Sequence, residues 1–176
     1  MMPKADAAEP DLDPFHAVID LAGEQLVLRP IAPSDATPLQ EMVRRSDPDD
    51  VRHRFHGALR SLPDALAARL TGIDHDHHTA LVAALGDELV AVARLVIDDD
   101  GAVAEFALAV RSDHHRRGIG LLLMQRLIVY AGLRGVKTLW GQIERDNRPM
   151  LDLAWRLGFK PDGVTDGVET RVSLTL

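Results

Sequence analysis

The stretch AEFALAVRSDHHRRGIGLLLMQRLIVY, residues 104–130, joins two kinds of apolar pattern through a segment rich in arginine and glycine. Its beginning, AEFALAV, is short and strand-like, whereas its end, LLLMQRLIVY, is typical of a buried helix. Between them stand the adjacent arginines Arg116 and Arg117 and the closely spaced glycines Gly118 and Gly120. This order predicts a strand, a tight turn and a helix over residues 119–133.

The turn in this stretch has the properties of an anion-binding site. The first N–H groups of a helix lack intrahelical partners, and the helix dipole makes that end positive. Glycines let a phosphate approach these N–H groups, and arginines can bind its oxygens in pairs. We therefore predict a pyrophosphate cradle at residues 116–120. The alternative is a glycine turn with solvated arginines.

Two other phosphate motifs are missing from the sequence. It contains no G-x-x-x-x-G-K-[ST], which argues against a nucleoside-triphosphate P-loop. It also contains no G-x-G-x-x-G that opens a βαβ unit, so a Rossmann dinucleotide site has little support.

Composition sets broad limits on the protein class. The 176 residues favour one domain, 46% of them are apolar, and the net charge of -7 argues against a nucleic-acid partner. There is no cysteine, and no apolar run approaches the roughly 18 residues of a membrane span. We expect a flexible arm over residues 1–20, a single domain over residues 21–176, a cytoplasmic location and no membrane partner. Monomer and homodimer both remain open.

The remaining patterns predict a mixed sheet with helices packed on it. Strands are expected at residues 26–31, 79–85, 89–97, 102–110, 136–143 and 168–176, the early ones linked as hairpins. Helices are expected at about residues 35–45, after Pro48, and at residues 61–73, 119–133 and 147–159.

Two motifs carry a resemblance to a known family. His115 to Gly120, HRRGIG, follows the signature [QR]-x-x-G-x-[GA] except at His115, and DNRPMLDLAWRLGF follows a second signature at residues 146–159. Over residues 25–176 the chain resembles the GNAT family of N-acetyltransferases. The resemblance implies an α/β fold with a mostly antiparallel mixed sheet of six to seven strands, splayed between the fourth and fifth and flanked by about four helices.

The resemblance also implies that acetyl-CoA binds in the splay. Its pyrophosphate would rest on the amides of residues 116–120, its pantetheine arm would pair with the strand before them, and Asn147 would lie near that arm. The residues implied in binding are Leu108, Ala109, Val110, His115, Arg116, Arg117, Gly118, Ile119, Gly120 and Asn147.

Glu105 is the candidate general base. Transfer to an amine requires a proton acceptor, since a lysine ammonium has a pKa of about 10.4. Glu105 is the one charged residue in the strand, and it shares a face with Val103 and Ala107. Burial there would raise its pKa toward a useful range. From the pattern alone, a glutamate in water or paired with Arg94 is an equal alternative, and the resemblance favours the base.

The family's usual tyrosine acid is replaced by Ala154, and the chain is most similar to the bacterial protein-lysine acetyltransferases. This similarity implies a lysine acceptor on a protein, such as an acyl-CoA synthetase. A small-molecule amine acetyltransferase and a non-catalytic acyl-CoA-binding regulatory domain remain alternatives. A mildly basic acceptor side, expected to meet an acidic patch beside the lysine, is formed by Arg52, His53, Arg54, His56, Arg60 and Arg69.

No metal site is predicted. His75, His77 and His78 lie close together, but adjacent polar residues on a loop rarely converge on one ion.

Overall fold

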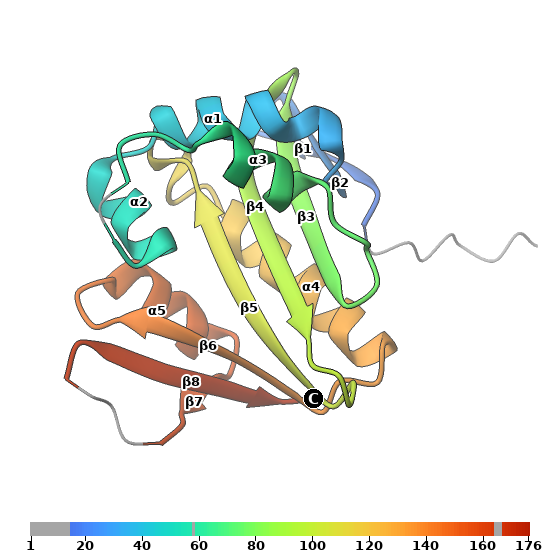
Figure 1. Cartoon of the computed structure of the whole chain (residues 1–176), viewed down its shortest axis with the longest axis vertical. Helices are drawn as coiled ribbons and strands as arrows, with labels where there is room; N and C mark the ends of the chain where they lie inside the picture. The colour runs from blue at the N-terminus through green and yellow to red at the C-terminus, as the bar shows by residue number, and fades with distance from the viewer. Residues whose placement is uncertain (1–14, 58, 164–166) are drawn as a thin grey trace, which may run out of the picture.

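An eight-stranded mixed sheet forms the centre of the computed structural model, which describes residues 15–57, 59–163 and 167–176 (Figure 1). The strands are β1 (Ala17–Leu21), β2 (Glu24–Pro30), β3 (His78–Leu85), β4 (Glu88–Ile97), β5 (Val103–Val110), β6 (Thr138–Glu144), β7 (Lys160–Pro161) and β8 (Glu169–Thr175). Their order is β1-β2-β3-β4-β5-β6-β8-β7. Only β5 and β6 pair in parallel. The predicted mixed α/β GNAT fold is confirmed.

The sheet has more strands than the six to seven expected, because β1 and the short β7 carry weak sequence signals. β1 pairs with β2 from Ala17↔Leu28 to Leu21↔Glu24. Ala17, Ile19 and Leu21 pack against the core, so the sheet begins inside the arm expected over residues 1–20. Residues 1–14 of that arm lie outside the described part of the chain.

Five helices and two short 3-10 turns connect the strands among the described residues. They are η1 (Pro33–Asp35), α1 (Ala36–Arg44), α2 (Pro48–Phe55), α3 (Asp64–Thr71), η2 (Ser112–His114), α4 (Ile119–Leu133) and α5 (Arg148–Arg156). Figure 1 shows α1 and α3 in front of the sheet and α4 behind it. Helix α4 has the predicted bounds. None of the described helices has the length and apolar character needed to span a bilayer.

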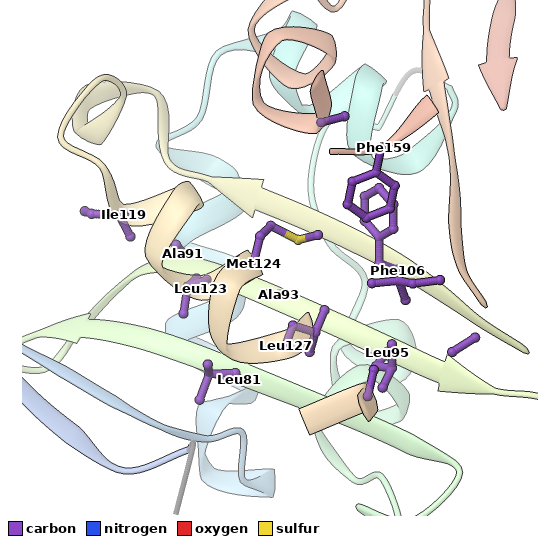
Figure 2. Packing of buried hydrophobic residues seen from close by; sticks show 14 of the residues in the cluster. Leu81, Ala91, Ala93, Leu95, Phe106, Ile119, Leu123, Met124, Leu127 and Phe159 are labelled. Atoms are coloured by element: carbon purple, nitrogen blue, oxygen red, sulfur yellow. The ribbon is translucent and has the colours of Figure 1, made fainter. Parts of the chain in front are cut away.

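Each face of the sheet has its own apolar core. On the α4 side, Leu123, Met124 and Leu127 are fully buried against the strands (Figure 2). On the other side, α1 and α3 cover alternate residues of the same strands, including Val82 and Val92. The strands β3 and β4 are therefore buried on both faces, which explains their nearly continuous apolar sequences.

The splay lies between β5 and β6. These are the fourth and fifth strands that the sequence predicts, residues 102–110 and 136–143, and their numbers rise by one because β1 precedes them. They pair at three positions only, ending at Glu105↔Trp140. The ring of the next residue, Phe106, is buried and lies 5.0 Å from the ring of Phe159 (Figure 2). A Cβ atom added to Gly141 of β6 would lie 2.7 Å from the Phe106 ring. The aromatic ring thus occupies the space where the two strands part, and Gly141 leaves room for it.

We predict that Gly141→Ala destabilises the fold by about 1–3 kcal/mol, the usual range for overpacking a core. The backbone at Gly141 is not left-handed, so the effect is steric. Urea unfolding checks the prediction against Gly132→Ala, an exposed position in α4 where an added Cβ meets nothing within 4 Å. That control should be neutral or stabilising by up to about 1 kcal/mol. Equal stability of Gly141→Ala and the parent would contradict the steric role.

Candidate functional site

A pocket of about 750 Å³ opens where β5 and β6 separate. One wall is the sheet from Glu105 to Val110, and another is the loop before α4 together with the start of that helix. Residues of α2 and α5 contribute the remaining walls. The pocket therefore joins the predicted cradle to the predicted base.

The start of α4 has the geometry of an anion site. Gly118 caps the helix with φ 81°, and Arg116 also lies in the left-handed region with φ 61°. No side chain caps this end, and the first helical bond runs from Leu122 N–H to the Gly118 carbonyl. The N–H groups of the first turn are therefore available, and Gly118, Ile119, Gly120 and Leu121 line the pocket. This arrangement fits the pyrophosphate expected at residues 116–120.

The two glycines have different roles in the structure. A Cβ atom on Gly118 would meet nothing within 4 Å, whereas one on Gly120 would lie 3.3 Å from Leu108 Cδ2 and 3.4 Å from Val110 Cγ2. Gly120 therefore allows α4 to pack closely on β5. The predicted phosphate approach at both glycines stays a prediction, and for Gly120, which also lines the pocket, the close packing on β5 is a second reason for glycine.

The two arginines of the turn also have different surroundings. Arg116 is exposed and lines the pocket. Arg117 does not line it, because its guanidinium pairs with Glu24 and lies 2.9 Å from His114 Nδ1. The structure thus brings one of the two predicted arginines to the site.

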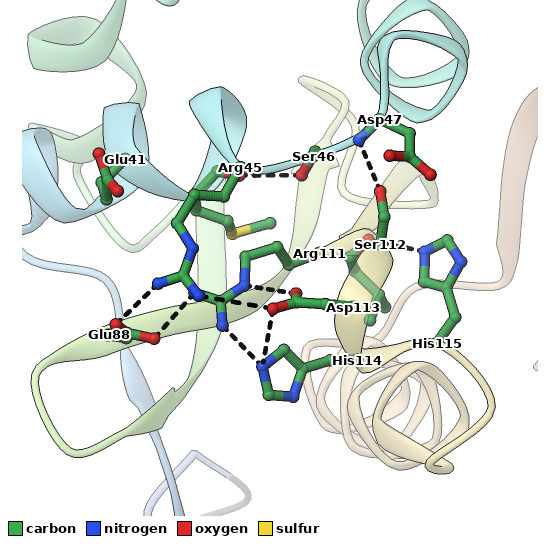
Figure 3. A network of polar contacts seen from close by, with 12 residues as sticks. Glu41, Arg45, Ser46, Asp47, Glu88, Arg111, Ser112, Asp113, His114 and His115 are labelled. Atoms are coloured by element: carbon green, nitrogen blue, oxygen red, sulfur yellow. Dashed lines mark hydrogen bonds and ion pairs between the residues drawn. The ribbon is translucent and has the colours of Figure 1, made fainter.

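A buried ion network supports the loop before α4 (Figure 3). The Arg111 side chain is 2% exposed and pairs with Asp113 at 2.7 Å and Glu88 at 3.0 Å. Burial lowers the pKa of Arg111, but the hydrogen bonds that Arg111 donates to Asp113 and Glu88 outweigh this effect, and the pKa is raised. Arg45 also pairs with Glu88, at 2.7 Å. This network fixes the end of β5 relative to the cradle.

His114 contacts two guanidinium groups of this region, Arg111 Nη2 at 2.7 Å and Arg117 Nη1 at 2.9 Å. Burial lowers the pKa of His114, and the nearby charges of Arg111 and Arg117 act in the same direction, while Asp113 opposes them. The ring is thus favoured in its neutral form. A neutral imidazole has one acceptor nitrogen, so only one of these contacts is a hydrogen bond.

The edge of β5 that faces the opening carries free backbone groups. The N–H of Arg111 donates to the Val90 carbonyl at 2.8 Å, on the β4 side. The backbone N–H and C=O groups of successive strand residues point to opposite edges of the strand. The groups of Leu108 and Val110 therefore point into the opening, and the groups of Ala109 point to β4. His115 Nε2 lies 2.9 Å from the Val110 carbonyl oxygen. Leu108 and Val110 are therefore the backbone positions that can pair with an extended arm.

Asn147 is both a cap and a pocket residue. Its side-chain oxygen accepts a hydrogen bond from Met150 N–H at 3.3 Å, which fixes the start of α5. It also lines the pocket, as the sequence predicts for a residue near the donor arm. Ala154, where the family's tyrosine would stand, is fully buried.

Glu105 lies at the last position where β5 pairs with β6, and it lines the pocket. Its side chain is exposed, so the burial expected from the apolar strand is wrong. The alternative partner Arg94 is also not bound to it, because Arg94 contacts His78 and donates to the Leu70 carbonyl. The carboxylate is therefore accessible to a ligand in the pocket.

Helix α2, which we call the bridging helix (Pro48–Phe55), connects the two sides of the opening. At its start, the Ser112 hydroxyl donates to Asp50, and Asp50 lies 3.4 Å from His115 Nε2. In its middle, Arg52 pairs with Glu144, the last residue of β6, and with Asp146 in the loop that follows. Sequence analysis missed this arrangement because neither group of partners is near α2 in the chain.

Three potential metal ligands, His53, Glu144 and Asp146, lie within 4.8 Å of one another. Arg52 already donates to both carboxylates, and the hydrogen bond from Arg52, followed by that from His53, holds the pKa of Asp146 below its usual range. We interpret the group as an ion-pair cluster. The loop histidines His75 and His77 are exposed, and His78 lies against Arg94.

Comparison with known proteins agrees with this architecture. The Acetyltransferase (GNAT) family model matches residues 40–159. The chain is 34% identical over 140 residues to Acetyltransferase Pat of Mycolicibacterium smegmatis, covering 77% of this chain but 41% of that protein. It is 26% identical to Acetyltransferase PA5475 of Pseudomonas aeruginosa over 141 residues, 78% of this chain and 76% of the relative. The chain belongs to the GNAT family and is an N-acetyltransferase.

Solved structures show the same fold. The GNAT domain of S. lividans PAT superposes with a TM-score of 0.84 at 22% identity, covering 92% of this chain and 97% of that domain. The cAMP-binding acyltransferase from Mycobacterium smegmatis gives a TM-score of 0.62 at 29% identity, and the match covers 92% of this chain but 48% of that protein. An acetyltransferase from Thermoplasma acidophilum, with a TM-score of 0.70, was solved with coenzyme A.

We predict that Arg116→Gln weakens acetyl-CoA binding about tenfold, since a hydrogen bond to a charged group contributes roughly 1.5–3 kcal/mol. Arg117→Gln removes the same charge from a side chain that faces Glu24 instead of the pocket, and it should change affinity less than threefold. Calorimetric titration at two salt concentrations measures both. Equal losses in the two variants would contradict the separate roles.

We predict that His114 makes stability depend on pH. Its pKa is lowered in the folded protein, so the unfolded chain binds the proton more readily. The stability that the neutral ring contributes is present above the unfolded pKa of about 6.5 and is lost as pH falls through the folded pKa. His114→Gln should therefore show a smaller fall in melting temperature between pH 7.5 and pH 5.5 than the parent. Exposed His77→Gln is the control, and the same fall in all three proteins would contradict the assignment.

Proposed function

We propose that this N-acetyltransferase transfers acetyl from acetyl-CoA to a lysine side chain of another protein, with Glu105 as the general base. The observation that carries the proposal is that one pocket connects the uncapped start of α4 with the accessible carboxylate of Glu105. Val110 is five positions along β5 from Glu105, roughly 17 Å of strand. An extended donor arm along β5 would bring its reactive end to the carboxylate.

The binding residues follow from the geometry. The first-turn amides of α4 and Arg116 would hold the pyrophosphate, and the backbone of Leu108 and Val110 would pair with the arm. Asn147 would contact the arm from the opposite wall. The bound donor supplies a thioester, whose acyl carbon is the electrophile.

The proton of the acceptor amine is taken up by a residue of this chain. Glu105 accepts the proton that the acceptor amine loses as its nitrogen bonds to the acyl carbon, either directly or through water. The carbon–sulfur bond then breaks and the thiolate departs. A thiolate is a good leaving group, so the reaction can proceed with Ala154 in place of a tyrosine acid, at some loss of rate.

The surroundings of Glu105 favour a protein acceptor. Its neighbours in the sheet are Val96, which is 44% exposed, and Trp140, which is partly exposed. Figure 1 shows no helix in front of this part of β4, β5 and β6. Such an open face suits a protein segment, whereas a free amine would need a closed pocket. Relatives named as Pat acetyltransferases support the same class.

An acyl-CoA synthetase as the acceptor and a cytoplasmic location stay predictions from the sequence. A small-molecule amine acceptor is the competing function. Labelled acetyl-CoA incubated with cell lysate and with a panel of small amines separates the two. Labelled protein supports the proposal, labelled small amine supports the competitor, and binding without transfer contradicts both.

We predict that Glu105→Gln lowers kcat by roughly 10²–10⁴, the usual loss on removal of a general base. Acetyl-CoA affinity should stay within about twofold of the parent, because the amide keeps the shape of the side chain. Release of free thiol measures turnover, and Glu41→Gln, at an exposed acid of α1 outside the pocket, is the control. Turnover of Glu105→Gln within about threefold of the parent would show that another group accepts the proton.

A further inference from the structure

The bridging helix and its C-cap residue His56 carry four basic side chains near the pocket, and three of them have acidic partners. Arg52 pairs with Glu144 and Asp146, His53 Nε2 lies 3.0 Å from Asp146, and His56 Nδ1 lies 2.7 Å from Glu169. These contacts give acidic partners to three of the six residues of the basic acceptor side that the sequence predicts. The fourth side chain, Arg54, differs from its neighbours.

Arg54 is a half-buried cation in the pocket wall. It lines the same pocket as Glu105, and its guanidinium lies 5.0 Å from the centre of the Phe55 ring. Within the described ranges it has neither a hydrogen bond nor an ion pair. Burial lowers the pKa of Arg54, and the charge of Glu105 offsets this only in part. A partly buried guanidinium without an acidic partner in the protein is an unfavourable arrangement, which an anionic group of a ligand would relieve.

A second guanidinium stands behind Arg54. Arg94, in β4, is 5% exposed and is the register partner of Ala107, which lines the pocket. It lies 3.0 Å from His78 Nε2 and donates to the Leu70 carbonyl at 2.7 Å, while its Nε has no partner. Burial, and then the charge of Arg54, lowers the pKa of Arg94 to about 10. Neither of its partners is a carboxylate, so this wall holds excess positive charge beside Glu105.

This excess charge constrains the acceptor. An ammonium group approaching Glu105 would meet Arg54 and, behind it, Arg94, and both would repel it. An acceptor with its own carboxylate near the amine removes that repulsion and gives the Arg54 guanidinium a partner of matching planar shape. We propose that Arg54 forms an anion subsite that selects amine acceptors bearing a carboxylate beside the reactive nitrogen. The inference rests on the proposed acetyl transfer at Glu105.

The carboxylate can belong to an aspartate or glutamate next to the target lysine, or to a free amino acid. Paired substrates separate these sources. The first set consists of lysine peptides in which one glutamate stands one or two positions before or after the lysine. Each is compared with the same peptide that has glutamine in place of the glutamate. Free lysine is matched by 1,5-diaminopentane, which lacks the carboxylate. The measured quantity is kcat/KM from thiol release.

With the parent protein, we expect the glutamate peptide to exceed its glutamine partner at least tenfold in kcat/KM for one or more positions, mainly through KM. Arg54→Gln should bring that ratio to within about twofold. Arg44→Gln removes the same charge from an exposed position of α1 outside the pocket, and it should keep the parent's ratio. Arg54→Glu should reverse the preference toward a peptide with arginine at that position, which a merely structural role of Arg54 would not produce.

A parent ratio near one for every pair overturns the subsite, and this measurement does not depend on any variant folding. A preference that survives in Arg54→Gln also overturns it, because the carboxylate is then recognised elsewhere. Preference for free lysine without any preference among peptides supports the subsite and assigns it to a small acceptor. Failure to acetylate any of these amines refutes the proposed transfer itself, whereas equal acetylation of all of them refutes only the subsite.

Discussion

The site depends on the parting of β5 and β6 after Glu105 and Trp140. Two parallel strands would normally continue their hydrogen-bond ladder, and here the buried ring of Phe106, set against Gly141 and Phe159, fills the space that continued pairing would need. The separation leaves the backbone of Leu108 and Val110 without a partner in β6 and opens the pocket. It also places Glu105 where the two strands part, so one packing feature creates both the pocket and the position of the proposed base.

A sheet that opens in this way needs another connection between its two halves, and the bridging helix supplies one. Its start is bound to Ser112 through Asp50, and at its end the C-cap residue His56 lies 2.7 Å from Glu169. In its middle, Arg52 pairs with Glu144 and Asp146. Glu144 is 8% exposed, so removal of Arg52 would leave a nearly buried carboxylate without its cation. The helix is thus held at both ends while its pocket-facing residues form part of the wall.

Patterns local in the chain predicted the fold well. Helix α4, helix α5 and the central strands were predicted from the glycine turn, the cap at Asn147 and the apolar runs. These elements are predictable because they depend on residues that are neighbours in the sequence. β1 was missed because its alternation is short and lies next to a polar arm. The sequence pattern left burial and exposure of Glu105 as equal alternatives, since the outcome depends on where α2 and β6 lie. The separate roles of Arg116 and Arg117 depend on Glu24, which is distant in the chain and gives no signal near the motif.

The acceptor side shows how the helical period changes the meaning of a charge cluster. In the sequence, Arg52, His53, Arg54 and His56 form one mildly basic group. At roughly 100° per residue, Arg52, His53 and His56 fall within about 100° of one another, and Arg54 lies roughly 160° from Arg52. The first three therefore meet the acids of β6, of the loop after it and of β8, while Arg54 turns to the sheet, where Arg94 adds a second positive charge. The charge that faces the pocket therefore depends on the direction in which each basic side chain of this short helix points, and not on the composition of the chain. This explains how an acidic chain can have a cationic wall beside Glu105.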